Sequence, residues 1–433
     1  MPLLAHGVGS RGDLPLPLWQ FVWAAVFAIV ISFVALGALW TTPRLAEAAK
    51  GRSLRWTRRP LRILEPLTRV VSLGLFVVVM TAGLWGSDIV AENLAPVSIY
   101  VMLWVVLQIA VPIVGNVWVV LSPFDTLAAA LERFRPSKLA GEGPGWSHWL
   151  APIAAAGFLF LELIHPQGDA PRTLGWAMLI YTAVVMAGVW RWGRAWLAHG
   201  ELFAVHLGLL GAMAPIVRDD RGWLRVRAPL SGLAAMRITP AATATLLVVL
   251  GGVSFDGLGE SELWRDIVGR HSGWDNAMWR LAGIITVTAL LSALYLASIR
   301  WMASITKRDP RVLANLFAPS LVPIVFGYTV AHYLQLAIDE SQTFVFRLSD
   351  PYGRGWDVLG TADGSINFDV VSTDMIAWFQ ALGVVVGHIA GVVVAHDRAI
   401  ATVDERDALR SQYVMLFVMV IYSVVGLWLL LNA

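Results

Sequence analysis

"LWQFVWAAVFAIVISFVALGALW", residues 18–40, contains no charged side chain. A helix needs about 20 apolar residues to cross the hydrocarbon core of a bilayer, so this stretch predicts a transmembrane helix. The composition of the whole chain agrees, because its 433 residues are 57% hydrophobic and 14% charged, whereas a soluble domain carries about 25% charge. The expected fold class is all-α, a polytopic bundle of transmembrane helices.

Ten spans are predicted, at about 18–40, 70–91, 97–121, 148–165, 174–191, 240–255, 280–301, 316–338, 374–396 and 413–432. Lys and Arg concentrate in cytoplasmic loops. With the N-terminus outside, the inner face holds 25 Lys and Arg residues and the outer face 7. We therefore expect both termini outside and a single membrane domain, 1–433.

Ten spans divide into halves of five, 1–191 and 240–433, joined by an inner segment, 192–239. An odd number of spans gives the halves opposite orientations. The third span of each half has a similar proline-containing stretch, "AVPIVGNVW" (110–118) and "LVPIVFGYT" (321–329). Matched interruptions of this kind mark binding sites in inverted repeats. Two independent proline kinks are the alternative.

Two histidines fall inside predicted spans, where an ionisable group is expensive and needs a partner or a function. His332 lies one turn after Tyr328, on the same helix face. His388 flanks a face of small residues, Gly383, Gly387 and Gly391, on which another helix can approach closely. Both histidines are expected to point into the bundle, as ligands, as proton carriers or as hydrogen-bonded packing residues.

Other polar groups accompany them. Glu162 and His165 are three residues apart in "FLFLELIHP" (158–166), the spacing used by carboxylate-bridged metal sites in helix bundles, although Glu162 could instead reach the outer interface. Gln108 and Asn116 lie in the third span, and Asp88 lies near the outer end of the second.

Two outer stretches join Asp to Gly, "GGVSFDGLGES" (251–261) and "RLSDPYGRGWDVLGTADG" (347–364). Their Asp256, Asp350 and Asp357 could bind a divalent cation through oxygen, but tight turns are the favoured interpretation. On the inner side, His206 is expected at the membrane surface, in an interfacial helix or a re-entrant segment. His396 is expected to be solvated at the inner boundary.

The chain resembles bacterial, mostly actinobacterial, membrane proteins named fenitrothion hydrolase. The resemblance covers the whole chain and rests on several stretches: "HGVGSRGDLPLPLW" (6–19), "SFVALGALW" (32–40), "GELFAVHLGLL" (200–210), "VSFDGL" (253–258), "LVPIVFGYTVAHY" (321–333), "LSDPYGRGWDVLGTAD" (348–363), "GHIAGVVVAHDRA" (387–399) and "RSQYVMLFVMVIYSVVGLWLL" (410–430). It implies hydrolysis of an organophosphate triester in a bacterial cytoplasmic membrane, with an apolar small-molecule substrate that enters from the lipid. It carries no catalytic residue over to this chain.

Triester hydrolysis commonly uses a divalent metal that activates water and polarises the phosphoryl oxygen. The chain has no cysteine, so His, Asp and Glu are the candidate ligands. For a metal of unknown identity we expect His332, His165, Glu162 and Asp256, with Asp88 able to orient a ligand. The candidate catalytic residues are Glu162, His332 and Tyr328.

Two alternatives stay open. One is a transporter of a metal ion or of a proton-coupled solute, in which His332 and His388 form steps of one path and must face the same side of the bundle. The other is an accessory membrane protein whose polar groups serve helix packing. Membrane lipid is the expected partner and nucleic acid is not, and no oligomeric state is predicted. Cleavage of a signal peptide before His6 would expose a copper-chelating N-terminus, although an ordinary start is the favoured interpretation.

Overall fold

The fold is a bundle of membrane-spanning helices, as a computed structural model describes it for residues 18–134, 141–219 and 222–432. In this part of the chain, nine helices are long and apolar enough to cross a membrane. The predicted span around residues 148–165 is a shorter helix of 14 residues. The predicted fold class, an all-α polytopic bundle of about ten spans, is therefore confirmed. His6 lies outside the described residues.

The long helices and the shorter α8 and α11 form the body of the bundle. They are α1 (Leu18–Leu39), α3 (Arg58–Trp85), α8 (Leu150–Leu163), α9 (Pro171–Trp192), α11 (Leu202–Gly211), α13 (Pro240–Gly259), α15 (Gly273–Thr306), α17 (Val322–Ser349), α18 (Thr373–Thr402) and α20 (Tyr413–Asn432). One further span is composite, with the short α4 (Leu94–Pro96), the π-helix η3 (Val97–Val106) and α5 (Leu107–Val114) in succession.

Short elements connect the body helices. The short helices are α2 (Leu45–Ala48), α6 (Trp118–Leu121), α7 (Pro123–Phe134), α10 (Leu197–Gly200), α12 (Ser231–Ala235), α14 (Glu262–Val268), α16 (Pro310–Phe317) and α19 (Glu405–Ala408). The 3-10 turns are η1 (Arg55–Thr57), η2 (Val90–Glu92), η4 (Gly145–Trp149), η5 (Arg194–Trp196), η6 (Ala318–Leu321), η7 (Phe368–Val370) and η8 (Arg410–Gln412).

A small antiparallel sheet joins two of the inner segments. Its strands are β1 (Arg52–Leu54), β2 (Ile216–Arg218) and β3 (Leu224–Val226), in the order β1-β3-β2. In the register, Arg225 pairs with both Ser53 and Val217.

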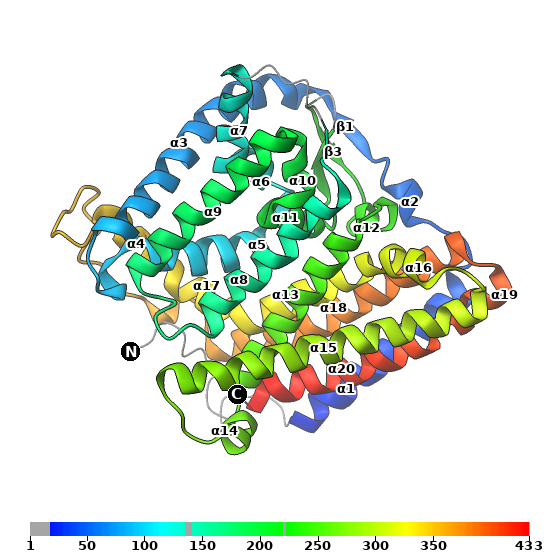
Figure 1. The fold of residues 1–433 in the computed structure, drawn as a ribbon. Coiled ribbons are helices and arrows are strands. Elements are labelled where there is room, and N and C mark those ends of the chain that lie inside the picture. Colours follow the sequence, from blue (N-terminus) through cyan, green and yellow to red (C-terminus); the bar gives the residue numbers. More distant parts are fainter. Residues whose placement is uncertain (1–17, 135–140, 220–221, 433) are drawn as a thin grey trace.

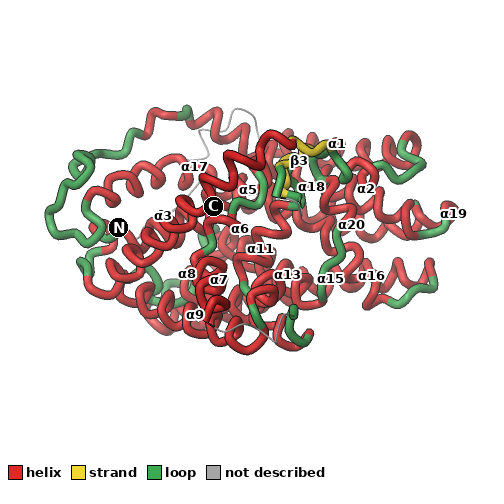
Figure 2. Tube along the Cα trace, turned by 90° about the horizontal axis from the view of Figure 1, so that it is seen from above, coloured by secondary structure: helices red, strands yellow, loops and turns green. Residues whose placement is uncertain are grey.

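The helices are arranged in two groups (Figure 1). In one, α1, α15 and α20 run side by side, and α17 packs along α18 between them and the other group. In the other, α3, α8 and α9 surround α11 and the η3–α5 span. Seen from above, the connections between the helices lie at the ends of the bundle (Figure 2).

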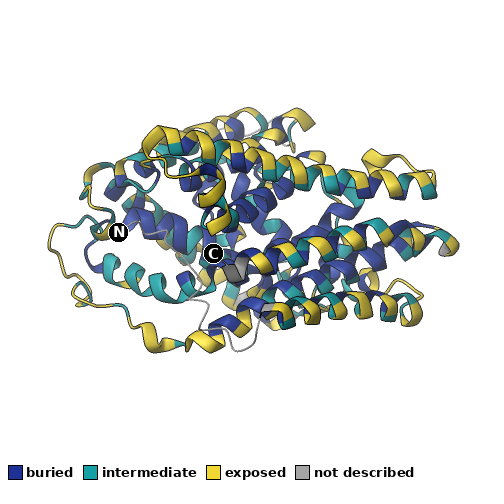
Figure 3. Cartoon of the chain, turned by 90° about the horizontal axis from the view of Figure 1, so that it is seen from below, coloured by how far each residue is buried: buried dark blue, intermediate teal, exposed yellow. Residues whose placement is uncertain are grey.

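The long helices carry exposed residues on their outer faces and buried residues toward the interior (Figure 3), and many of the exposed side chains are large and apolar. Exposed side chains of this kind include Trp23, Ile31, Val70 and Leu290. Such a surface is unfavourable in water, since soluble monomers rarely expose large contiguous apolar patches. It is the surface expected of helices that contact lipid.

Small residues bring α17 and α18 into direct backbone contact. A Cβ atom built on Gly387 would lie 2.6 Å from the carbonyl oxygen of Pro323 and 2.9 Å from Cα of Gly327. The expected small-residue face of residues 383–391 is therefore a helix contact. It sets His388, next to Gly387, against the interior of the bundle, where its side chain is buried.

Three expectations for short segments are wrong. Residues 251–259 are not a turn, because α13 continues through Gly259. His206 is not exposed at the protein surface but lies on the buried helix α11, with 1% of the residue exposed. His396 is also buried, where its ring nitrogens contact the carbonyl oxygen of Trp40 and the amide of Gln412.

The two VPIV stretches occupy different parts of their helices. Val111–Val114 ends α5 just before Gly115, whose φ of 101° is left-handed. The second stretch, 322–325, forms the first turn of α17. An inverted repeat would place matched residues at the same position along each span, so these stretches do not support it, and the repeat stays a prediction.

Candidate functional site

A buried carboxylate on α13 joins two side chains of α17. Asp256 faces inward from the last two turns of α13, and its Oδ2 accepts hydrogen bonds from Nε2 of His332 at 2.9 Å and from the hydroxyl of Tyr333 at 2.6 Å. All three side chains are buried. Because a carboxylate can only accept, Nε2 of His332 carries the proton in this bond. The structure thus brings together the predicted residues Asp256 and His332.

Glu162 lies beside this trio. Its side chain is 7% exposed on α8, and in the described structure its Oε2 has no hydrogen-bond partner. It is near enough to Asp256 and Tyr333 for its charge to act on both. Glu162 therefore does not reach the interface with water. A buried carboxyl oxygen without a partner is costly, and such groups gather at functional sites in membrane proteins.

A basic side chain closes the outer end of the cluster. Arg280 on α15 donates from Nε to the carbonyl oxygen of Leu163 at 2.5 Å and forms an ion pair with Glu260 at 3.3 Å. Its charge also acts on Asp256. The cluster of Glu162, Asp256, His332 and Tyr333 thus has a neighbouring cation at the end of α13.

Polar groups continue from the cluster along the interior of the bundle. The ring of Tyr328 stacks on that of His332 with centroids 5.9 Å apart, as the predicted shared helix face requires. Tyr422 of α20 interacts with Tyr328 and shares a hydrogen bond of 2.7 Å with Ser254. The ring of His388 follows, with its centroid 5.6 Å from that of Tyr422.

Unused hydrogen-bonding atoms lie at both ends of this row. The hydroxyl of Tyr328 and Nε2 of His388 have no partner among the described residues, while Nδ1 of His388 donates to the carbonyl oxygen of Val384 at 2.8 Å. Because Gly387 packs on Gly327, His388 lies about 8 Å from His332 along α17, at 1.5 Å per residue. The two histidines therefore face the same interior at different depths.

The remaining acidic and histidine candidates lie elsewhere. α8 ends at Leu163, so His165 does not share a helix face with Glu162; its Nδ1 accepts from the backbone N–H of Gln167, and its ring contacts that of Trp274. Asp88 forms an exposed ion pair with Arg172 at 3.2 Å. Neither residue belongs to the cluster around Asp256.

Gln108 forms a second polar contact, in the other group of helices. Its Oε1 accepts a 2.9 Å bond from Nε2 of His206, and its amide bonds to the carbonyl oxygen of Trp104 within η3. Asn116 packs against Gly211 of α11. These contacts attach α11 to the η3–α5 span, while Oδ1 of Asn116 and Nδ1 of His206 have no hydrogen-bond partner among the described residues.

The outer aspartates after α17 make turns, as favoured. Asp350 accepts from the backbone N–H groups of Arg354 and Gly355. Asp357 accepts from the N–H of Ala362 and from the hydroxyl of Ser349. These bonds hold the pKa of Asp357 below its usual value, the backbone N–H first.

Three of the four predicted metal ligands, Glu162, Asp256 and His332, lie in the cluster, and the fourth, His165, does not. The described residues contain no group of three or more His, Cys, Asp or Glu side chains that could hold a metal ion. His332 and Asp256 are paired with each other, and His165 lies apart from them. A metal at this place would have to replace the two hydrogen bonds that Asp256 accepts. The metal site stays a prediction.

At the basic end of the helices, charged groups form a separate network. Asp125 of α7 pairs with Arg194 at 2.6 Å and with Arg69 at 2.6 Å, and Glu65 pairs with Arg69 and Arg218. Burial alone would raise the pKa of Asp125, but the two guanidinium groups hold it below its usual value. This network fixes α3, α7 and η5 to one another.

Sequence reasoning missed three members of the buried row. Tyr333 was overlooked although it follows His332 directly, and Tyr422 was overlooked although it interrupts an apolar run. Ser254 was overlooked because serine is common in helices. A search for hydroxyl groups near the intramembrane histidines would have found the two tyrosines. Their joint position depends on the packing of α13, α17 and α20, which the sequence does not give.

Comparison with known proteins adds no relative, since no protein-family model, curated protein or solved structure matches this chain.

Proposed function

We propose that the chain is a proton-linked secondary transporter of a bacterial cytoplasmic membrane, in which Glu162, Asp256 and His332 bind the coupling proton. One observation carries the proposal. The buried hydrogen-bonded trio of Asp256, His332 and Tyr333 lies beside Glu162, whose Oε2 has no hydrogen-bond partner among the described residues. Ionisable groups in this arrangement within a helix bundle are typical of proton relays in pumps and transporters.

The polar groups next to this trio form a path that a proton could follow from His332 toward His388. Tyr328 and Tyr422 lie between His332 and His388, so a proton accepted at the cluster has hydroxyl groups and a second imidazole on its inner side. Imidazole suits this work because its two nitrogens can accept a proton at one side and release it at the other. The transport alternative required both histidines to face the same interior, and their positions meet that requirement.

Charge displacement after a pH jump tests the proposal without knowledge of the solute. Proteoliposomes are adsorbed on a solid-supported membrane, and the transient current is recorded when the buffer is acidified. We expect a protein-dependent displacement of charge that Asp256→Asn and Glu162→Gln abolish. Asp88→Asn is the matched control, because Asp88 is an exposed carboxylate in a surface ion pair. An unchanged current in both cluster variants would refute the proposal.

A second candidate is the hydrolysis of an organophosphate triester, which the resemblance to fenitrothion hydrolases implies. The specific observation in its favour is the Asp256–His332 bond, because a carboxylate that orients an imidazole is the usual support of a histidine acting as general base. Tyr328 would then lie next to the reacting group, and a bound divalent metal, if the reaction needs one, would supply an activated water.

Nitrophenol release from a nitrophenyl phosphate triester separates the two candidates. Hydrolysis predicts steady product formation by the purified protein and its loss in His332→Ala. If chelation with EDTA also abolishes the reaction, the metal-dependent form is supported. No release above that of His332→Ala, together with a normal pH-jump current in the wild type, leaves the transporter.

A further inference from the structure

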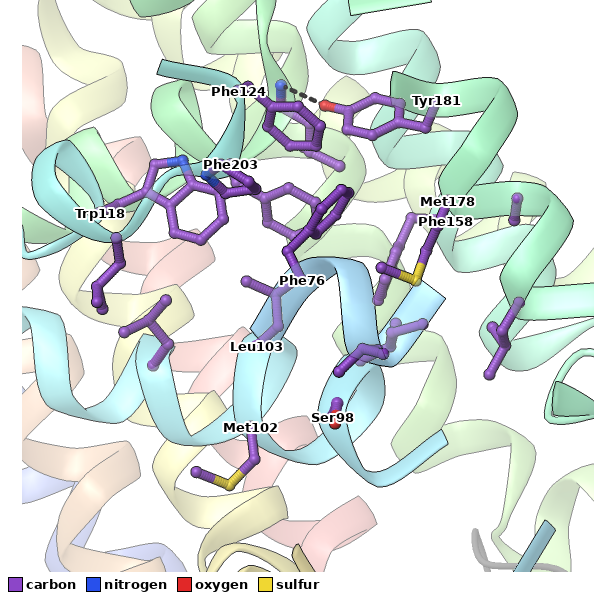
Figure 4. Close-up of a pocket in the computed structure, with 18 of the residues that line it drawn as sticks. Phe76, Ser98, Met102, Leu103, Trp118, Phe124, Phe158, Met178, Tyr181 and Phe203 are labelled. Atoms are coloured by element: carbon purple, nitrogen blue, oxygen red, sulfur yellow. Dashed lines mark hydrogen bonds between the residues drawn. The ribbon is translucent and has the colours of Figure 1, made fainter. Parts of the chain in front are cut away.

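An apolar chamber of about 730 Å³ lies between α3, the η3–α5 span, α8 and α9 (Figure 4). Phe76, Leu103, Phe158 and Met178 project into it from these four sides. Its lining includes none of the four cluster residues, Glu162, Asp256, His332 and Tyr333. Pockets of about 300–1,000 Å³ are the size that holds small-molecule ligands.

The polar side chains in the chamber wall are already hydrogen-bonded. Ser98 and Thr68 bond to the carbonyl oxygens one turn earlier, Ser72 to that of Leu121, and Tyr100 to that of Gly168. The hydroxyl of Tyr181 and the indole N–H of Trp118 both donate to Glu201. A polar ligand would find none of these donors free, so the chamber suits a hydrocarbon chain.

The chamber opens to the bilayer between α8 and α9. Ile153 of α8 lines it and is 65% exposed, and Ile180 and Val184 of α9 line it and are 60% and 41% exposed. Residues that line a cavity and also face lipid form its entrance. What stands at this entrance in a membrane is the tail of a lipid molecule.

The basic end of the same two helices carries groups that suit a lipid headgroup. Trp149 lies one turn before Ile153 and is exposed, and Trp190 and Arg191 are exposed in the last turn of α9. Tryptophan gathers at the level of lipid headgroups, and arginine binds phosphate. Arg191 follows Val184 by seven residues, so it lies on the same helix face, about 10 Å closer to the surface.

We propose that the chamber binds one acyl chain of a membrane phospholipid, which enters between α8 and α9 and places its phosphate beside Arg191. The bound chain would fill a void that is otherwise unfavourable between helices in the membrane, because the atoms that line an empty cavity lack contacts on one side. This binding depends on neither transport nor hydrolysis.

Gly157 offers a way to fill the chamber without a clash. It lines the chamber, and a Cβ built on it meets no atom within 4 Å. Gly74 of α3 is the matched control, because it is exposed like Gly157 and its Cβ also meets nothing within 4 Å, but it does not line the chamber. Gly157→Phe should fill the chamber, whereas Gly74→Phe should project into lipid.

Native mass spectrometry of the full chain, reconstituted with phosphatidylglycerol and then released from detergent, tests the proposal. We expect one retained phospholipid on the wild type and on Gly74→Phe, and its loss in Gly157→Phe. Arg191→Gln should retain lipid but lose the preference for phosphatidylglycerol over uncharged diacylglycerol. Circular dichroism establishes that each variant is folded, and Ile153→Trp, which narrows the entrance from the lipid side, should also reduce retention.

Three outcomes would overturn the proposal. In the first, the wild type carries no lipid after reconstitution, and this result alone refutes phospholipid binding. Gly157→Phe and Ile153→Trp could retain as much lipid as Gly74→Phe, which would place the lipid elsewhere. The bound mass could be that of an isoprenoid lipid carried over from the cell and not displaced by phosphatidylglycerol, which would contradict the phospholipid assignment.

Discussion

The two hydrogen bonds that Asp256 accepts predict that one substitution has opposite effects in two backgrounds. In the wild type, Tyr333→Phe removes a 2.6 Å bond to a buried carboxylate. Hydrogen bonds to charged groups contribute about 1.5–3 kcal/mol in water-soluble proteins, and bonds between membrane helices contribute at most about 1.7 kcal/mol. We therefore expect Tyr333→Phe to destabilise the fold by about 1–1.7 kcal/mol.

In the Asp256→Ala background the sign should reverse. That substitution leaves the Nε2–H of His332 and the hydroxyl of Tyr333 buried without their acceptor, at about 1–3 kcal/mol each. Adding Tyr333→Phe removes one of the two unpaired donors and should recover about 1 kcal/mol or more. The coupling free energy between the two positions is the difference between the two effects of Tyr333→Phe, so that their magnitudes add because their signs are opposite.

Unfolding by SDS in mixed bicelles, followed by circular dichroism, gives the free energies for this cycle. The matched control is the cycle of Ser254→Ala and Tyr422→Phe, whose neutral hydroxyl pair should couple by about 0.6 kcal/mol, the average for bonds between membrane helices. Equal effects of Tyr333→Phe in both backgrounds would refute the hydrogen-bonded trio.

Three further predictions concern the helix contact, the charge network and an inner anchor. Gly387→Ala places a Cβ 2.6 Å from the carbonyl oxygen of Pro323 and should destabilise the bundle by about 1–3 kcal/mol, as overpacking does. The control Gly426→Ala, whose Cβ would have its nearest atom at 3.7 Å, should not destabilise it. Equal unfolding free energies of the two variants would contradict the helix contact. Since the pKa of Asp125 is lowered in the folded state, its stabilisation is complete above the unfolded carboxyl pKa of about 3.9 and is lost as the pH falls through the lower folded value. Asp125→Asn should therefore be less stable at neutral pH and lose less stability on acidification, and parallel pH profiles of the melting temperature would contradict this. Arg398 is buried and donates to the carbonyl oxygens of Leu233, Leu316 and Met236. Arg398→Gln should therefore lower the free energy of unfolding in SDS by at least about 2 kcal/mol. An unfolding free energy equal to that of the wild type would contradict the role of Arg398 as an anchor.

Hydropathy was enough to predict the fold class, because burial of apolar side chains in lipid depends on composition over about 20 residues and not on distant contacts. For the segment 251–259, by contrast, local sequence patterns did not predict the conformation. Its Asp and glycines favour a turn, but α13 continues because Asp256 finds donors on α17, 76 residues away. A partner so distant in sequence is invisible to local reasoning.

Burial of the two other histidines has the same cause. His206 lies on a ten-residue apolar helix, too short to span and so expected at the surface, yet Gln108 of another span accepts its Nε2–H. His396 precedes two charged residues, which suggested solvent, yet Trp40 and Gln412 enclose it. The structure brings the predicted residues Glu162, Asp256 and His332 together, whereas His165 lies beyond the end of α8 and Asp88 lies in an exposed ion pair.

Infrared difference spectroscopy between neutral and acidified buffer tests the central claim most directly, because it reports the protonation of buried carboxyl groups themselves. The proton-binding account predicts a carbonyl-stretch band that appears on acidification, is lost or shifted in Glu162→Gln or Asp256→Asn, and persists in Asp88→Asn. If that band is absent from the wild type, or is the same in both cluster variants as in the wild type, Glu162 and Asp256 do not exchange a proton. The proposed coupling site is then wrong.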